Sequence, residues 1–132
     1  MSFGLASARP SPHATCPCGG GAFGHCCGPI LEGVPAPSAE RLMRSRYTAF
    51  VVGDAAHLLR SWHPRTRPDE IVVDDGTTWR GLVIDGAEED GDAGVVSFRA
   101  AWRQHGIDGE LHERSRFVRR GGRWVYVDGD VD

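Results

Sequence analysis

Apolar residues recur at every third or fourth position between Ser38 and Gly53, which is the spacing of one face of an α-helix. Ser38 is a good N-cap, and Gly53 is a typical residue just beyond a helix C-terminus. The apolar stripe comprises Leu42, Met43, Tyr47, Phe50 and Val51, and the opposite, polar side is expected to hold Arg41, Arg44, Ser45 and Thr48.

A second, shorter helix is predicted after Asp54, which is another good N-cap. Its inward residues are expected to be Ala55, Leu58, Leu59 and Trp62. Pro64 is expected to end this helix, because a proline forces the residue before it, His63, toward an extended conformation.

The second half of the chain alternates apolar and polar residues with a period of two, as half-buried antiparallel strands do. Four strands are predicted, at residues 77–84, 94–103, 111–118 and 123–128, with turns at 90–92, 106–109 and 121–122. Helices followed by a meander predict an α+β fold. We expect two or three helices packed on one face of a curved antiparallel sheet of about four strands.

Composition excludes several functions. All 15 basic residues are arginine, so chemistry that needs a lysine, such as Schiff-base formation, is excluded. The net charge of −3 makes nucleic acid an unlikely partner. No apolar run is long enough for a signal peptide or a membrane span, so we expect a cytoplasmic protein without a membrane association.

All four cysteines fall between positions 16 and 27, around a glycine-rich loop: Cys16, Cys18, Cys26 and Cys27. Four thiolates around one point match a closed tetrahedral Zn²⁺ site. Free or redox-active thiols and structural disulfides are the alternatives, the latter disfavoured by a cytosolic location and by the strain of an adjacent Cys26–Cys27 pair. A closed site leaves no position to activate water, so the sequence predicts a structural metal that folds the loop.

The stretch CPCGGGAFGHCCGP at positions 16–29 resembles the SEC-C zinc motif, with Phe23 as its aromatic residue and the four cysteines as ligands. Seven residues separate Cys18 from Cys26, one fewer than in the motif, so His25 is kept as an alternative fourth ligand.

Longer strings resemble the YchJ-like family of small bacterial proteins: LMRSRYTAF at 42–50, WHP at 62–64, HERSRF at 112–117 and GRWVYVDG at 122–129. This resemblance implies the cone-shaped domain of nuclear transport factor 2-like (NTF2-like) proteins, carrying a SEC-C element. It implies no settled activity. We therefore predict a mobile tail at 1–15, a zinc-binding loop at 16–29 that presents a docking surface to a protein partner, and a cone domain at 38–132 that folds by itself.

Cone domains of this type often enclose a pocket between the helices and the sheet, and such a pocket is the default ligand site. The candidate pocket residues are Tyr47, Trp62, His63, Trp79 and Glu113, with Phe98, Trp102, Arg44, Arg46 and Arg114 as further candidates. Arg41 and Arg44 fit a phosphate site or, equally well, a solvated helix face. A binding role is favoured and a small-molecule enzyme or carrier is the alternative, because few charges are expected to converge in the pocket. Glu113 and Arg114 are consecutive in a strand and point to opposite faces.

Overall fold

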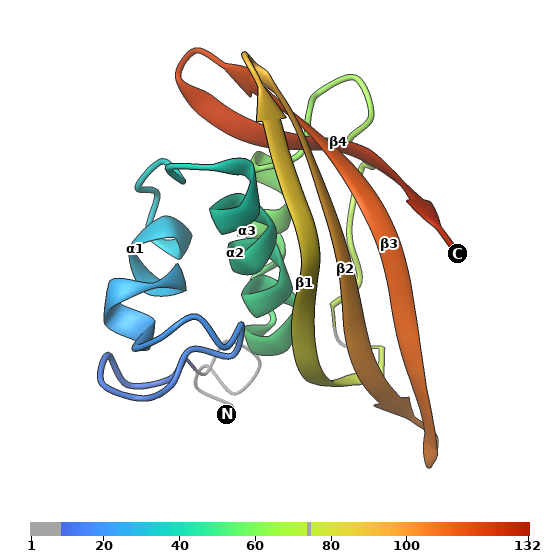
Figure 1. Ribbon diagram of the computed structural model, residues 1–132. Coiled ribbons are helices and arrows are strands. Elements are labelled where there is room, and N and C mark those ends of the chain that lie inside the picture. The colour runs from blue at the N-terminus through green and yellow to red at the C-terminus, as the bar shows by residue number, and fades with distance from the viewer. Residues whose placement is uncertain (1–8, 74) are drawn as a thin grey trace.

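The computed structural model describes residues 9–73 and 75–132, and it has the α+β architecture that the sequence predicts (Figure 1). A 3-10 turn, η1 (Phe23–His25), precedes three helices: α1 (Cys27–Leu31), α2 (Ala39–Val52) and α3 (Ala55–Arg60). Four strands follow: β1 (Thr78–Asp90), β2 (Ala93–Gln104), β3 (Ile107–Arg120) and β4 (Arg123–Val131). No helix in the described ranges is long and apolar enough to cross a membrane.

The strands form one antiparallel sheet in the order β1-β2-β3-β4, and the sheet curves around α2 (Figure 1). Register shifts in β1, and one at Arg116/Phe117 in β3, add bends to the ladder. The strands are longer than expected, because backbone pairing continues through polar residues that the apolar pattern does not mark. The second turn lies at His105 and Gly106 rather than at 106–109, whereas Gly121 and Gly122, both with positive φ, form the last hairpin turn as predicted.

Helix α2 begins and ends where the sequence predicts. The Ser38 side chain accepts a hydrogen bond from the backbone N–H of Arg41, and Gly53 adopts the left-handed conformation with φ 79°. The expected polar side is wrong in part: Ser45 and Thr48 are completely buried, and Val51 is 40% exposed. The sheet covers one side of α2, while α1, α3 and the cysteine loop cover much of the other side. Ser45 and Thr48 are therefore buried, although they lie on the side of the helix that would face water if only the sheet packed against it.

Helix α3 ends at Arg60, earlier than Pro64 predicts. The chain becomes extended at once and pairs with β4, because Tyr126 N–H donates to Ser61 C=O at 2.8 Å and His63 N–H donates to Tyr126 C=O at 2.7 Å. This pairing ties the end of the helical layer to the last strand.

Residues 9–15 are not the mobile tail that the sequence suggests, and residues 1–8 lie outside the described part of the chain. Arg9 forms ion pairs with Glu32 and Asp54, and the Phe23 N–H donates to Ala14 C=O at 2.8 Å. These contacts hold the segment against the cysteine loop.

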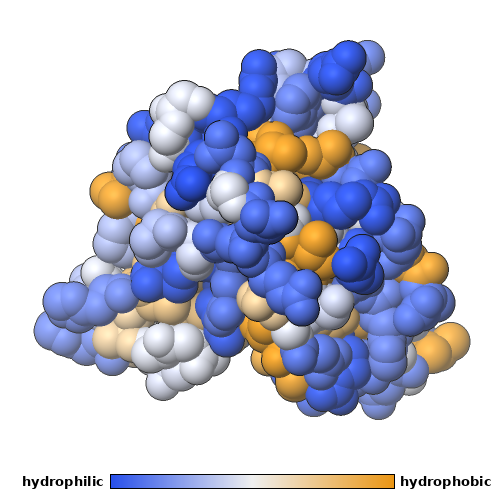
Figure 2. Space-filling model, turned by 45° about the horizontal axis from the view of Figure 1, so that its top comes forward, coloured by the Kyte–Doolittle hydropathy of each residue, from blue (hydrophilic) through white to orange (hydrophobic). Residues whose placement is uncertain are grey.

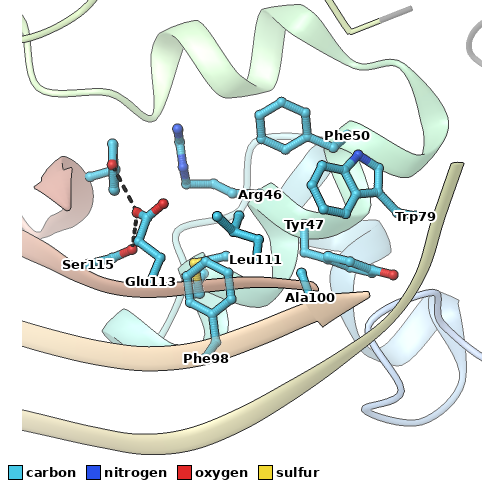
Figure 3. A pocket seen from close by; sticks show the side chains of 11 residues that line it. Arg46, Tyr47, Phe50, Trp79, Phe98, Ala100, Leu111, Glu113 and Ser115 are labelled. Atoms are coloured by element: carbon cyan, nitrogen blue, oxygen red, sulfur yellow. Dashed lines mark hydrogen bonds between the residues drawn. The ribbon is translucent and has the colours of Figure 1, made fainter. Parts of the chain in front are cut away.

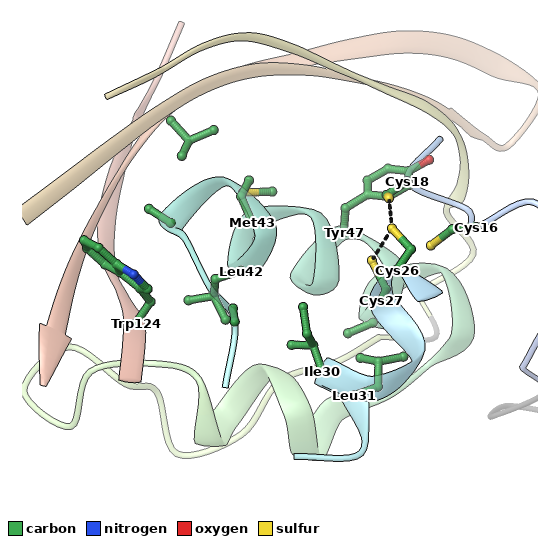
Figure 4. Packing of buried hydrophobic residues seen from close by; sticks show 14 of the residues in the cluster. Cys16, Cys18, Cys26, Cys27, Ile30, Leu31, Leu42, Met43, Tyr47 and Trp124 are labelled. Carbon is green, nitrogen blue, oxygen red and sulfur yellow. Dashed lines mark hydrogen bonds between the residues drawn. The ribbon is translucent and has the colours of Figure 1, made fainter. Parts of the chain in front are cut away.

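The cysteines belong to the same buried cluster as the apolar face of α2, together with Phe23, Ile30 and Leu31 (Figure 4). The cysteine loop and the cone domain therefore share a core, and this packing argues against a domain at 38–132 that folds independently. On the outer surface, Figure 2 shows one face on which hydrophobic patches lie between hydrophilic side chains.

Candidate functional site

The cysteine loop is folded back on itself by its own backbone. Thr15 pairs with Ala22, Cys16 N–H donates to Gly21 C=O at 2.7 Å, and Gly19 N–H donates to Cys16 C=O at 2.8 Å. A Cβ at Gly20 would lie 3.0 Å from the Cys26 sulfur and 3.1 Å from the Cys18 sulfur. A glycine at this position therefore lets the loop close tightly over the thiols.

The four sulfur atoms lie within 4.8 Å of one another (Figure 4). Cys18 Sγ is 3.4 Å from Cys26 Sγ, which is 4.0 Å from Cys27 Sγ. Sulfur atoms at the corners of a tetrahedral zinc site are about 3.8 Å apart, given a metal–sulfur distance of about 2.3 Å. The cluster fits a metal ion bound by four thiolates.

The surroundings of the sulfurs also fit a closed metal site. Each cysteine is at most 4% exposed, and all four are free thiols rather than disulfides. A redox sensor needs solvent-exposed thiolates, whereas the four cysteines of this loop are buried. His25 is exposed and lies outside the cluster, so it is not required as a fourth ligand.

Helix α2 supplies a second layer of contacts around the sulfurs. The Thr48 hydroxyl donates to Cys27 Sγ at 3.3 Å and lies 3.7 Å from Cys16 Sγ. Arg44 donates to the carbonyl of Cys18 at 2.9 Å and is paired with Glu40, while Arg41 donates to the carbonyl of Cys26 at 3.4 Å. These arginines hold the loop; they do not form the free, solvated face that the sequence allowed.

The thiols strongly influence one another's protonation. Hydrogen bonds from Cys18 and Cys27 lower the pKa of Cys16, whereas burial and the neighbouring Cys18 raise the pKa of Cys26 to about 11. The pKa of Cys27 is raised by its hydrogen bonds with Cys16 and Cys18 and by burial. Without a cation, the buried cluster thus favours the thiolate of Cys16 and the protonated thiols of Cys26 and Cys27, whereas a bound metal would favour thiolate ligands.

A separate cavity of about 160 Å³ lies between α2 and the concave face of the sheet (Figure 3). Aromatic and aliphatic side chains form most of its wall, and Arg46, Glu113 and Ser115 add polar groups. The lining residues are Met43, Arg46, Tyr47, Phe50, Trp79, Phe98, Ala100, Leu111, Glu113, Ser115 and Tyr126.

Two charged groups, Arg46 and Glu113, line this cavity. Arg46 is only 4% exposed, and burial lowers its pKa to about 10, so its guanidinium stays charged at neutral pH. Glu113 Oε2 accepts hydrogen bonds from Ser115 at 2.6 Å and from Tyr126 at 3.1 Å. Burial and Glu113 raise the pKa of Tyr126, which keeps its hydroxyl protonated as a donor.

The predicted pocket residues divide into two groups. Tyr47, Trp79 and Glu113 line the cavity, as do Phe98 and Arg46. The placement of Trp62 and His63 in the lining is wrong. Trp62 packs edge-on against Tyr126, with ring centroids 5.0 Å apart, and stacks on Arg46 behind the cavity wall.

His63 lies away from the cavity because its backbone is bonded to β4, and its Nδ1 accepts a hydrogen bond from the Arg65 N–H. Trp102 is also outside the lining, beside its cross-strand partner Gly109. Arg44 is bonded to the cysteine loop, and Arg114 is exposed. Six lining residues are not among the predicted ones: Met43, Phe50, Ala100, Leu111, Ser115 and Tyr126. The period-two alternation is a signal for two of them, since it places Ser115 on the same face of β3 as Phe117 and Tyr126 on the same face of β4 as Trp124.

Comparisons with known proteins agree with this architecture. Residues 38–129 match the family model described as the middle NTF2-like domain of YchJ. The chain is 52% identical to a UPF0225 protein of Streptomyces coelicolor, over 90% of this chain and 97% of that protein. It is 44% identical to a UPF0225 protein of Ralstonia nicotianae, over 92% and 94% of the two chains.

Two solved structures share the fold. The solution structure of a SEC-C motif containing protein from Rhodopseudomonas palustris has a TM-score of 0.82 and 34% identity, and the match covers 90% of this chain and 99% of that one. A crystal structure of a SEC-C motif containing protein from Psychrobacter arcticus has a TM-score of 0.75 and 24% identity, covering 92% and 84%.

Proposed function

This chain belongs to the YchJ-like family of SEC-C motif proteins, and we propose that it is a zinc-binding accessory protein whose cone domain binds a ligand. The metal is structural: it holds the cysteine loop on α2, and α2 forms one wall of the cavity. The single observation that carries the proposal is the convergence of four buried cysteine sulfurs within 4.8 Å.

The donor set supports zinc as the metal. Four thiolates in a tetrahedral arrangement select Zn²⁺ or iron, and they fill every position around the ion. Bound there, zinc supplies folding free energy and a fixed loop geometry, while Thr48, Arg41 and Arg44 orient the loop around it.

The cavity supports binding more than catalysis. Among its lining residues Glu113 is the one carboxylate, and one of its oxygens is already occupied by Ser115 and Tyr126. His63, one of the candidate pocket residues, lies outside the cavity lining. Docking of a protein partner on the cysteine loop stays a prediction. Such a partner would contact the exposed glycines, because the other side of the loop packs against α2.

Metal analysis tests the proposal directly. Protein purified without chelator should contain one zinc per chain, and its thiols should resist alkylation until the metal is removed. A Cys27→Ser variant should lose the metal, whereas a His25→Ser variant, changed at an exposed residue outside the cluster, should keep it. Iron in place of zinc would change the assignment, and a metal-free protein with two disulfides would overturn it.

A further inference from the structure

Arg46 is a buried cation that has no carboxylate bonded to it among the described residues. Its guanidinium is stacked between Trp62 and Tyr126, 4.9 Å and 4.5 Å from the ring centroids, and among the described residues it forms no ion pair. Charged groups in protein interiors are as a rule paired, because an isolated charge loses its hydration without compensation. The cation–π contacts and the Glu113 carboxylate in the same cavity offset part of this cost, but no anion is bonded directly to the guanidinium.

The guanidinium also keeps unused hydrogen-bond donors. Both of its hydrogen bonds come from Nη1, to the Leu58 carbonyl at 2.8 Å and to the Ser61 hydroxyl at 2.7 Å. Nη2 and Nε therefore have no hydrogen-bond partner in the described part of the chain, and the residue lines the cavity. Such a fork of two donors suits a carboxylate, which it can bind through two parallel hydrogen bonds.

Glu113 presents an unused acceptor to the same space. Ser115 and Tyr126 both donate to Oε2, so Oε1 is left without a partner among the described residues, and Figure 3 shows the carboxylate directed to the side of the cavity where Arg46 lies. The two bonds to Oε2 fix the carboxylate in place. A ligand that meets both groups needs an anion and a hydrogen-bond donor close together.

The rest of the cavity is apolar. Phe50 and Trp79 pack against each other with ring centroids 6.1 Å apart, and Tyr47 adds an edge contact to Trp79. An apolar wall with a few convergent polar groups is the usual composition of a small-molecule site. The wall fits an aromatic or branched aliphatic body attached to the polar end.

We propose that this cavity binds a small carboxylic acid that carries a hydrogen-bond donor, an ammonium or hydroxyl group, beside the carboxylate and an apolar body behind it. The carboxylate pairs with Arg46, the donor pairs with Glu113, and the body lies against Phe50 and Trp79. This inference rests on the proposed ligand-binding role of the cone domain, but not on the identity of the metal.

Four compounds with the same phenyl group test it on the metal-loaded protein by NMR chemical-shift titration. Phenylalanine and phenyllactate carry both polar groups, hydrocinnamate lacks the donor, and phenethylamine lacks the carboxylate. Phenylalanine or phenyllactate should saturate with a Kd of about 1 mM or tighter. Hydrocinnamate and phenethylamine should each bind at least about tenfold more weakly than phenylalanine, since each lacks a group that forms hydrogen bonds to a charged side chain.

Matched variants locate the binding. Ala100→Ile fills the cavity and should abolish the shifts, while Ala101→Ile places the same side chain on the other face of β2 and should leave them unchanged. Glu113→Gln should remove the advantage of phenylalanine over hydrocinnamate. Arg46→Gln should remove the advantage of phenylalanine over phenethylamine, with the melting curve recorded to establish that the variant is folded.

The result can go against the inference in three ways. The inference is overturned if none of the four compounds shows saturable binding to protein that is fully metal-loaded and cooperatively folded. That result would leave the metal assignment intact. The inference is also overturned if phenethylamine binds as well as phenylalanine, because Arg46 then has no role, or if Ala101→Ile blocks binding as strongly as Ala100→Ile does.

Discussion

Removing the hydroxyl of Thr48 should weaken metal binding without opening the core. This residue is completely buried on α2, and its hydroxyl hydrogen-bonds to Cys27 Sγ at 3.3 Å and lies 3.7 Å from Cys16 Sγ. Thr48→Val keeps the shape of the side chain and replaces the donor by a methyl group. The Cys27 sulfur then loses a hydrogen bond that stabilises its thiolate, which is the form that binds a metal.

The magnitude follows from the kind of bond that is lost. A hydrogen bond to a charged group contributes about 1.5–3 kcal/mol, and loss of such a supporting contact around a metal site typically costs about 10–100-fold in affinity. We therefore expect Thr48→Val to bind zinc at least tenfold more weakly. Because the Thr48 hydrogen bond lowers the pKa of Cys27, the variant should also release its metal at a higher pH than the parent protein does.

Thr48→Ser is the matched control, since it keeps the hydroxyl and removes the methyl group. Loss of a buried methyl group should cost about 1 kcal/mol of the free energy of unfolding, with and without metal alike, and should leave the affinity near that of the parent. Competition with a chromophoric zinc chelator, under a reductant that does not bind metal, measures all three proteins. Equal affinities for Thr48→Val and the parent, or equally weak binding by both variants, would refute the reasoning.

Three further outcomes are expected. Gly20→Ala should weaken zinc binding, because its Cβ would press on two cysteine sulfurs, whereas Gly86→Ala, with open space around the new Cβ, should leave the chelator competition unchanged. Burial, with Arg60 and Arg46 nearby, lowers the pKa of His57 to about 4, so the unfolded chain binds a proton that the folded chain does not between about pH 6.5 and 4. Stability should thus fall by about 3 kcal/mol as the pH falls through that window, and His57→Gln should flatten this difference in denaturant titrations; parallel curves would contradict it. Finally, a chelator should lower the melting temperature of the whole chain, because the cysteines belong to the common core; a loop that melts while the main transition stays in place would restore the independent cone domain.

Local rules predicted the parts of the fold that depend on local chemistry. The cap at Ser38, the left-handed Gly53 and the hairpin at Gly121 and Gly122 each follow from the conformational preferences of single residues. The same rules misplaced the end of α3, because the pairing of Ser61 and His63 with Tyr126 joins segments more than sixty positions apart. No local sequence signal near Pro64 predicts that contact.

For the candidate sites, the sequence identified the cysteines but not their support. Four thiols at this spacing are improbable without a metal, so the cluster is visible in the chain itself. By contrast, the periodicity of α2 predicts that Thr48 and Ser45 lie on the solvent-exposed side of the helix. Only the docking of the loop and of α3 on that side makes them buried, and no pattern within the helix encodes a partner that comes from elsewhere in the chain.

The position of α2 explains why one small chain combines a metal cluster with an aromatic cavity. Thr48 contacts the sulfurs, while its neighbour Tyr47 lines the cavity, so consecutive residues of one helix serve the two sites. The same turn of the helix carries Arg44, which donates to the loop carbonyl of Cys18, and Arg46, which lines the cavity. A helix anchored only by its contacts with the sheet would be free to shift against the cavity. The cysteine loop on its opposite side restricts that freedom, and this is the physical reason to regard the proposed zinc site as a support for the proposed binding site.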